Sequence, residues 1–154
     1  MTKLRQKILF FYALSVFASA TPLDREFRAT WVITWEYISS SQNAEQTMAR
    51  IDEIMDNHAT ANMNAVLFQV RQSGTAYYNS SYEPWGYYAG YEHPGIDPLQ
   101  YAIDAAHSRG LELHAWFNVF QASSIHEGAP AQAHPEWVCR DRDGDPMTLS
   151  LIHI

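Results

Sequence analysis

The sequence has one cysteine, few lysines and no apolar segment long enough to span a membrane, and each shortage excludes something. The lone Cys139 has no partner for an internal disulfide, and we expect a packed or incidental thiol there rather than a nucleophile. No lysine follows Lys7, and 17 acidic residues stand against 10 basic ones, for a net charge of -7. A chain this acidic has no general attraction for phosphate, which argues against a nucleic-acid partner.

The sequence is rich in aromatic and other hydrophobic residues. Hydrophobic residues, aromatics included, make up 47% of its 154 residues and the aromatics alone 14%, too large a share for a disordered tail that buries no core. The length allows one domain of ordinary size.

The first twenty residues have the pattern of a signal peptide. Three basic residues lie among the first seven, residues 8–17 form an apolar run, and residues 18–20 read Ala-Ser-Ala, the pattern of a signal peptidase site. A transmembrane helix needs about 20 apolar residues, so this run is too short to span a bilayer. We therefore expect export, to the periplasm or the extracellular space, and no stable membrane span after cleavage; an uncleaved anchor is the alternative. Cleavage would leave seven Arg, no Lys and a net charge of -10.

The last six residues read LSLIHI, which resembles the translation of an adapter used in sequencing libraries. We expect a non-native tail there, with the natural sequence continuing beyond position 147 or 148. The alternative is an apolar strand at a natural C-terminus. The expected division is a signal peptide at 1–20, one domain at 21–148 and the tail at 149–154.

Between these ends, apolar runs rich in β-branched and aromatic residues alternate with helical spacings. Met48, Ile51, Ile54 and Met55 recur at intervals of three and four, as in an amphipathic helix. An alternation of strands and helices implies parallel pairing and an α/β fold. The sequence predicts strands at 27–34, 64–71 and 111–118, helices at 45–57 and 98–109, a stop at Gly110, and a long loop at 72–97.

Alternation within two strands predicts one apolar face and one polar face. The apolar face would hold Val66, Phe68, Val70, Leu113, Ala115 and Phe117, and the polar face Gln69, Arg71, Glu112, His114, Trp116 and Asn118. A parallel sheet covered by helices on both sides should be apolar on both faces. A face that becomes more polar towards the C-terminal strand ends suits a barrel with a site at that rim. The alternative is a smaller sheet with one face in water.

Six blocks of the sequence occur in an order found in one known family. They are EFRATWV at 26–32, NAVLFQVR at 64–71, EPWGYY at 83–88, GIDPL at 95–99, AHSRGLELHAWFN at 106–118 and HPEWV at 134–138. In these blocks the chain resembles the glycosyl hydrolase-like family ten domain.

The resemblance implies a (β/α)8 TIM barrel that acts on polysaccharide in the bacterial envelope. At least one member class is associated with cleaving peptidoglycan glycan strands stripped of their peptides. A complete barrel needs about 250 residues, so we expect this chain to hold a truncated N-terminal part, about three βα units. The family's Asp-rich block at its fourth strand, of the DGIHLDD type, is absent, and with it the expected source of catalytic carboxylate.

We expect no complete pair of catalytic acids within the chain itself. Most glycosidases use two carboxyl groups about 5–9.5 Å apart, and barrels place them at or after the C-terminal ends of strands. Glu36, Glu83, Glu92 and Glu127 follow predicted strands without directly ending one, and Glu112 lies at the N-terminal end of its strand. The catalytic residues therefore stay unknown, and we expect this chain alone to be inactive.

Polar side chains near the predicted rim are candidates for binding sugar. Gln69 and Arg71 offer donors suited to hydroxyls or to an N-acetyl carbonyl. His114 and Asn118 do the same from the third strand, with Trp116 between them. The alternative, strongest for His114, is a polar network that braces the fold.

Seven aromatic residues lie within the fifteen positions 77–91. Sugar rings pack their C–H faces on such side chains. A long loop can equally use its own aromatics to hold itself compact. We favour Tyr77 and Trp85 as substrate contacts, and Trp35 after the first strand as a stacking wall or else a cap on the core.

Two further patterns predict no metal and no cofactor. Residues 141–145 read DRDGD but lack the glutamate at the twelfth position of a calcium loop, so we expect a solvated turn. The seven histidines are scattered without the spacing of metal ligands. The leading hypothesis is thus the N-terminal part of an exported glycoside hydrolase. The alternatives are a non-catalytic carbohydrate-binding barrel and a fragment with no independent function.

Overall fold

A computed structural model of the protein describes residues 26–147. The predicted signal peptide at 1–20 and the predicted tail at 149–154 lie outside these residues. Along the chain the elements are β1 (Ala29–Val32), α2 (Thr34–Tyr37), α3 (Ala44–Thr60), β2 (Ala65–Gln72), β3 (Thr75–Ala76), η1 (Tyr87–Ala89), α4 (Pro98–Ser108), β4 (Glu112–Phe117), α5 (Pro130–Ala133) and η2 (Pro135–Trp137).

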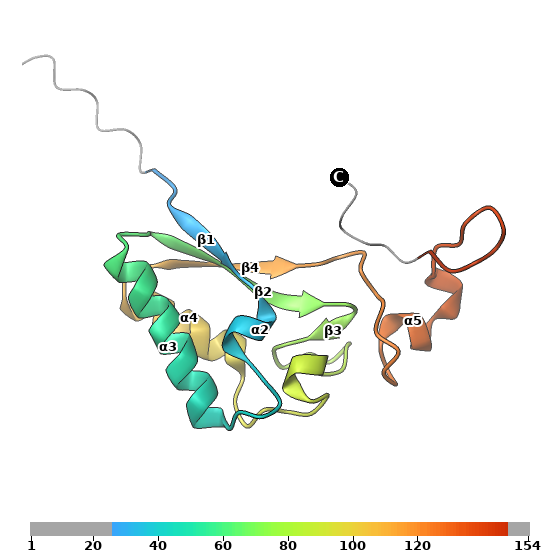
Figure 1. Ribbon diagram of the computed structural model, residues 1–154, viewed down its shortest axis with the longest axis horizontal. Coiled ribbons are helices and arrows are strands. Elements are labelled where there is room, and N and C mark those ends of the chain that lie inside the picture. Colours follow the sequence, from blue (N-terminus) through green and yellow to red (C-terminus); the bar gives the residue numbers. More distant parts are fainter. Residues whose placement is uncertain (1–25, 148–154) are drawn as a thin grey trace, which may run out of the picture.

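The sheet is open, and β2 lies in its middle. β1 and β4 both pair with β2 in parallel, and the short β3 pairs with it antiparallel. The C-terminal ends of β1, β2 and β4 therefore meet at one edge of the sheet (Figure 1). The predicted α/β class and parallel pairing are confirmed.

Capping residues determine where the two long helices begin and where α4 ends. Asn43 caps α3 in a capping box, since its side chain accepts from the Gln46 N–H while the Gln46 side chain accepts from the Asn43 N–H. Asp97 caps α4, which has a proline in its first turn. Gly110, at a φ of +72°, follows the end of α4, as the sequence predicts.

The core lies between the sheet and these helices. Helices α3 and α4 lie on the same side of the sheet (Figure 1). Val66, Phe68 and Val70 of β2 belong to one buried cluster with Ile51 and Met55 of α3. All five side chains are buried. Truncating one of the larger members, such as Phe68, to alanine would cost about 3–5 kcal/mol, because the cavity would not refill.

The opposite face of the sheet carries aromatic side chains that stay exposed. Trp31 of β1 reaches across β2 to Trp116 of β4, with ring centroids 4.8 Å apart and an interplanar angle of 80°. Phe27 contacts His114 in the same edge-on manner, at 5.4 Å. Among residues 26–147 no helix packs over this face. The predicted helix-covered face is therefore present, whereas the second face carries aromatic as well as polar side chains.

Two sequence predictions are wrong at their edges. The strand predicted at 27–34 ends at Val32, because Thr34 starts the helical turn α2. The loop predicted at 72–97 contains β3 and η1. β3 follows a two-residue turn in which Ser73 and Gly74 have φ of 56° and 80°, as a type I′ hairpin requires.

Beyond β4 the chain leads to α5 and η2 and then to a tight turn (Figure 1). In that turn the Asp141 carboxylate accepts from the N–H groups of Asp143 and Asp145, at 3.0 and 2.9 Å. The predicted turn at 141–145 is confirmed. In the described part of the chain, no three His, Cys, Asp or Glu side chains gather as metal ligands would. None of the helices described there is long and apolar enough to cross a membrane.

Candidate functional site

The edge where β1, β2 and β4 end is the candidate site. Three segments extend from it: α2 after β1, the β3 hairpin with its following loop after β2, and residues 118–126 after β4. In parallel α/β proteins, ligand sites form from the loops at the C-terminal strand ends. The described loops enclose two hollows there.

Arg71 connects two of these segments. Its Nε donates to both carboxylate oxygens of Glu83, at 2.9 and 2.8 Å, and its Nη2 donates to Glu83 Oε1 at 2.6 Å. Its Nη1 donates to the backbone carbonyls of Asn118 and Val119 beyond β4. Since most of its donors are engaged inside the protein, Arg71 holds the loops in place rather than presenting a free guanidinium.

Gln69 is fully buried beside α2. Its Oε1 accepts from the backbone N–H of Thr34 at 3.2 Å and lies 3.3 Å from the Thr34 hydroxyl oxygen, and that hydroxyl donates to Gln72 Oε1 at 2.8 Å. The hydroxyl of Tyr37 donates to the Gln69 carbonyl at 2.7 Å. Gln69 Nε2 has no partner among the described residues. These bonds fasten α2 to the end of β2.

Tyr77 is also buried, with 1% of its surface exposed. Gly86 lies directly against its ring, since a Cβ on Gly86 would come within 2.3 Å of the Tyr77 Cζ. The hydroxyl accepts from the Tyr88 N–H at 3.4 Å. Burial raises the pKa of Tyr77 to about 12, so the phenol stays neutral at ordinary pH.

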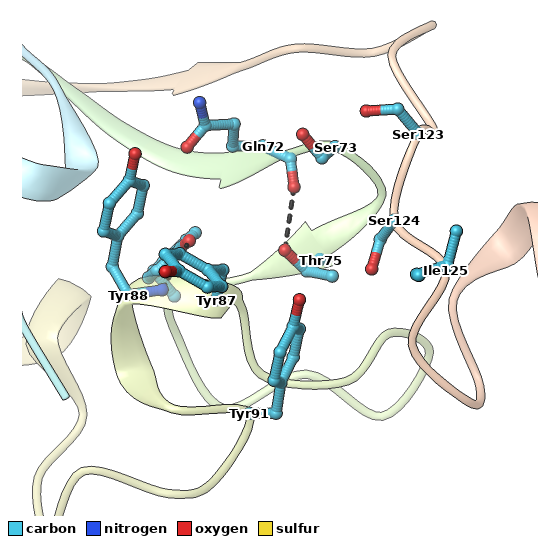
Figure 2. Close-up of a pocket in the computed structure, with 10 residues that line it drawn as sticks. Gln72, Ser73, Thr75, Tyr87, Tyr88, Tyr91, Ser123, Ser124 and Ile125 are labelled. Atoms are coloured by element: carbon cyan, nitrogen blue, oxygen red, sulfur yellow. Dashed lines mark hydrogen bonds between the residues drawn. The ribbon is translucent and has the colours of Figure 1, made fainter.

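The first hollow is a cavity of about 280 Å³ that we call the serine–tyrosine pocket. Tyr91 points its hydroxyl end towards Thr75 and Ser124, and the Thr75 hydroxyl donates to the Gln72 carbonyl at 2.8 Å (Figure 2). The residues that line the pocket come from both sides of the hairpin and from the segment after β4. It is lined by Gln72, Ser73, Thr75, Tyr77, Tyr87, Tyr88, Tyr91, Ser123, Ser124 and Ile125.

The second hollow lies beside the Arg71–Glu83 pair and has a volume of about 350 Å³. Apolar groups from Tyr78 and Phe117 form part of its wall, with ring centroids 6.2 Å apart. Tyr82 at its edge is 92% exposed. We call it the Arg71 hollow. It differs from the serine–tyrosine pocket in having an ion pair in its wall.

The residues predicted to bind sugar fall into separate groups. Tyr77 lines the serine–tyrosine pocket and Arg71 the other hollow. Asn118 is buried next to Arg71, with its Nδ2 donating to Gln121 at 3.1 Å. Trp35 is half exposed and contacts Tyr88, at 5.8 Å. Trp85 contacts His93 at 5.2 Å and lines neither hollow.

His114 and Trp116 lie apart from these, on the exposed face of the sheet. His114 pairs with Leu67 in the middle of β2 rather than with a residue at the strand end. Its Nε2 lies 3.3 Å from Glu112 Oε2. Their predicted role in sugar binding remains a prediction that would require the ligand to reach this face.

Sequence reasoning did not select several residues that shape the rim. Thr34 carries no motif, and Ser73, Thr75, Ser123 and Ser124 look like ordinary loop residues. The Ser73–Gly74 dipeptide between two strands was the one local signal of a hairpin. The pairing of Arg71 with Glu83 spans 12 positions and has no signature in the sequence.

The carboxylates at this edge do not form an acid/base pair. Glu83 reaches the rim, but Arg71 occupies both of its oxygens. Glu36 lies in α2 with its side chain exposed, and Arg50 donates to its backbone carbonyl. The arrangement can therefore bind and orient a polar ligand, and among the described residues Glu83 is the one carboxylate that lines either hollow.

Comparison with known proteins agrees with the resemblance in the sequence. The family model described as glycosyl hydrolase-like 10 matches residues 26–150. The chain is 36% identical over 143 residues to the glycosyl hydrolase YngK of Bacillus subtilis, covering 82% of this chain and 28% of that protein. It is 36% identical over 121 residues to the glycosyl hydrolase DigH of Escherichia coli K12, covering 69% and 27%. The chain thus spans little more than a quarter of the length of these relatives. It belongs to the glycosyl hydrolase-like 10 family.

Proposed function

We propose that the protein is an exported glycoside hydrolase that cleaves polysaccharide, with glycan strands of peptidoglycan as its substrate. The observation that carries this is the sheet edge. Three consecutive parallel strands end side by side, and their loops form two hollows lined by hydroxyl and aromatic groups. Such a lining matches the C–H faces and hydroxyls of sugar rings. The relatives are named glycosyl hydrolases, which favours hydrolysis over binding alone.

The fold we propose is a (β/α)8 barrel, of which the described residues form about three βα units. The sequential strand order β1-β2-β4 and the helices on one face are what a barrel wall requires. Trp31 and Trp116 would then face the interior of the barrel. The second carboxyl group for catalysis would come from a later strand.

The test is hydrolysis by the protein expressed from its complete coding sequence. Purified glycan strands stripped of peptides, intact peptidoglycan and chitin are incubated with it, and the new reducing ends are counted. We expect release from the stripped strands at a rate well above that from the other two. No release from any of them would overturn the proposal.

The alternative is a carbohydrate-binding protein without catalysis. One observation favours this alternative: Glu83, the carboxylate at the rim, forms an ion pair with Arg71. Binding of the stripped strands without new reducing ends, under conditions that permit hydrolysis by a known glycosidase, would support this alternative. Export is tested on its own by sequencing the N-terminus of the mature protein, where we expect cleavage after Ala20.

A further inference from the structure

The serine–tyrosine pocket and the Arg71 hollow differ in charge, and this difference has a consequence for the ligand. Among residues 26–147, no Asp, Glu, Lys, Arg or His lines the serine–tyrosine pocket. The Arg71 hollow, in contrast, holds Arg71 and Glu83 in its wall. A carboxylate or sulfate moved into the first pocket would lose hydration and meet no cationic side chain in its lining.

The pocket does offer many neutral hydrogen-bonding groups. Among the described residues, the hydroxyls of Ser73, Ser123 and Tyr91 make no hydrogen bond to another protein group, so they are available to a ligand. The Ser124 hydroxyl accepts from the His126 N–H at 3.2 Å and keeps its own proton to donate. Groups that can both donate and accept suit the hydroxyls of a sugar.

Aromatic surface is present at the same place. Tyr87 is 67% exposed and meets Tyr88 edge-on, with ring centroids 5.3 Å apart. Tyr91 stacks on His126 at 4.1 Å and 13°, which covers one face of its ring. The exposed ring of Tyr87 is therefore the natural platform for the apolar face of a pyranose.

The pocket is held in shape by its backbone. Tyr91 has a φ of 61°, a conformation that a bulky side chain rarely adopts, and its N–H donates to the Gly86 carbonyl at 3.1 Å. Strained residues of this kind persist where surrounding structure fixes them, and they gather at ligand sites. The segment after β4 is also held against the hairpin, because the Ser124 N–H donates to the Ser73 carbonyl at 2.9 Å.

We infer that the serine–tyrosine pocket is a subsite for one uncharged sugar unit, a hexose or an N-acetylhexosamine, of the polysaccharide. This inference rests on the proposed function and narrows it. The volume of about 280 Å³ lies just below the range of about 300–1,000 Å³ for pockets that hold drug-sized ligands, so it suits a single ring. In a strand of alternating neutral and acidic sugars, the pocket takes the neutral one.

The experiment uses the protein from its complete coding sequence and measures binding by titration calorimetry. The probes are the trisaccharide of N-acetylglucosamine, cellotriose and trigalacturonate. We expect the two neutral probes to bind at least about tenfold more tightly than the acidic one, since a carboxylate placed against this neutral lining loses part of its hydration and gains no cationic partner. Tighter binding of trigalacturonate would overturn the inference.

Two matched variants locate the binding. Tyr87→Ala and Tyr82→Ala remove the same side chain from the same loop, but Tyr87 lines the serine–tyrosine pocket and Tyr82 the Arg71 hollow. We expect Tyr87→Ala to weaken the binding of the neutral probes about tenfold and Tyr87→Phe to restore most of that loss, whereas Tyr82→Ala should weaken their binding clearly less than Tyr87→Ala does. Circular dichroism checks that each variant is folded.

The outcomes separate this inference from the proposed function. If the protein releases reducing ends from glycan strands but Tyr87→Ala leaves the binding of neutral probes and the KM unchanged, the inference fails alone. If the unmodified protein neither binds nor cleaves any of these sugars, both fail together. An equal loss in Tyr87→Ala and Tyr82→Ala would also contradict the assignment of the sugar to one pocket.

Discussion

The guanidinium of Arg71 and the carboxylate of Glu83 form a bidentate pair, with Nη2 and Oε1 2.6 Å apart and only 12% and 13% of the two side chains exposed. Through the same guanidinium, the chain after β4 is bound at the carbonyls of Asn118 and Val119. One side chain at the end of β2 therefore fixes two loops of the candidate site. The fixed fork of an arginine permits this, and a lysine would not reproduce it.

Glu83→Gln should destabilise the protein by about 2–3 kcal/mol, because it leaves a largely buried guanidinium without its counter-charge. The matched control is Glu53→Gln, which breaks the exposed pair with Arg50 and should cost at most about 0.5 kcal/mol. Urea denaturation followed by circular dichroism measures both. Equal losses in the two variants would mean that the Arg71–Glu83 pair does not order the loops.

Thr34→Val should cost about 1–2 kcal/mol, because its hydroxyl donates to Gln72 and lies within hydrogen-bonding distance of Gln69. Valine keeps the shape and removes the hydroxyl. Thr47→Val is the control: Thr47 is also buried in a helix, its hydroxyl makes no hydrogen bond within residues 26–147, and the change should stay within about 0.5 kcal/mol. A neutral Thr34→Val would show that α2 is held at the sheet edge by packing alone.

Stability should fall as pH rises from 10 to 12, and Tyr77 should account for part of the fall. Burial raises its pKa from 10.0 to about 12 in the folded protein, so the unfolded chain loses the proton first. The stabilisation is complete below pH 10 and is lost as the pH passes 12. Urea midpoints across this range should decline less steeply for Tyr77→Phe than for the unmodified protein. Part of the decline should remain in Tyr77→Phe, because burial also raises the pKa of Tyr37. Tyr82 is exposed, so Tyr82→Phe should show the same decline as the unmodified protein.

The elements that sequence reasoning found are those with a periodic signal. The helix predicted at 45–57 is α3. Its apolar residues Ile51, Ile54 and Met55 lie on one face of the helix and are buried in the core, so their spacing indicates the helix. The turn α2 could not be found, because four residues carry no period and Trp35 looks like the continuation of a strand. Tertiary bonds from Thr34 to Gln69 stabilise it instead.

The part of the candidate site that lies at the strand ends was predictable from the sequence. Parallel pairing puts Arg71 and Asn118 at one edge, and their contact follows from that register. The pairing of Arg71 with Glu83 does not follow from the strand register. Glu83 lies in the loop after β3, and the path of that loop depends on β3 and on the packing of Gly86 against Tyr77. Pockets between loops depend on such paths, so nothing in the sequence indicates that Ser73 and Ser124 line the same pocket.

If the sheet closes into a barrel, Trp31 should be protected in the protein expressed from its complete coding sequence. Within the described residues Trp31 is 61% exposed and Trp137 is 66% exposed, so the two should be oxidised alike if nothing further covers them. Hydroxyl-radical footprinting resolves each residue by mass spectrometry. We expect Trp31 to react at least about fivefold more slowly than Trp137, since barrel interiors are filled by side chains. Equal rates would contradict the barrel and favour a smaller sheet with one face in water.

Gly74→Ala should both destabilise the protein and weaken the binding of neutral sugars. At a φ of +80° an added methyl group strains the backbone by about 1–2 kcal/mol. It would also come within 3.1 Å of Pro130 Cδ and 3.2 Å of Ala122 Cα, so the segment that carries Ser123 and Ser124 must shift away from the pocket.

Gly110→Ala separates these two effects. Gly110 has a similar φ of +72° but no atom within 4 Å of an added Cβ, so it should show the backbone strain alone. Calorimetry with the N-acetylglucosamine trisaccharide should then give weaker binding for Gly74→Ala and unchanged binding for Gly110→Ala, at matched losses of stability. If both variants bind as the unmodified protein does, residues 123–125 are not a wall that the sugar touches, and the pocket must be open on that side.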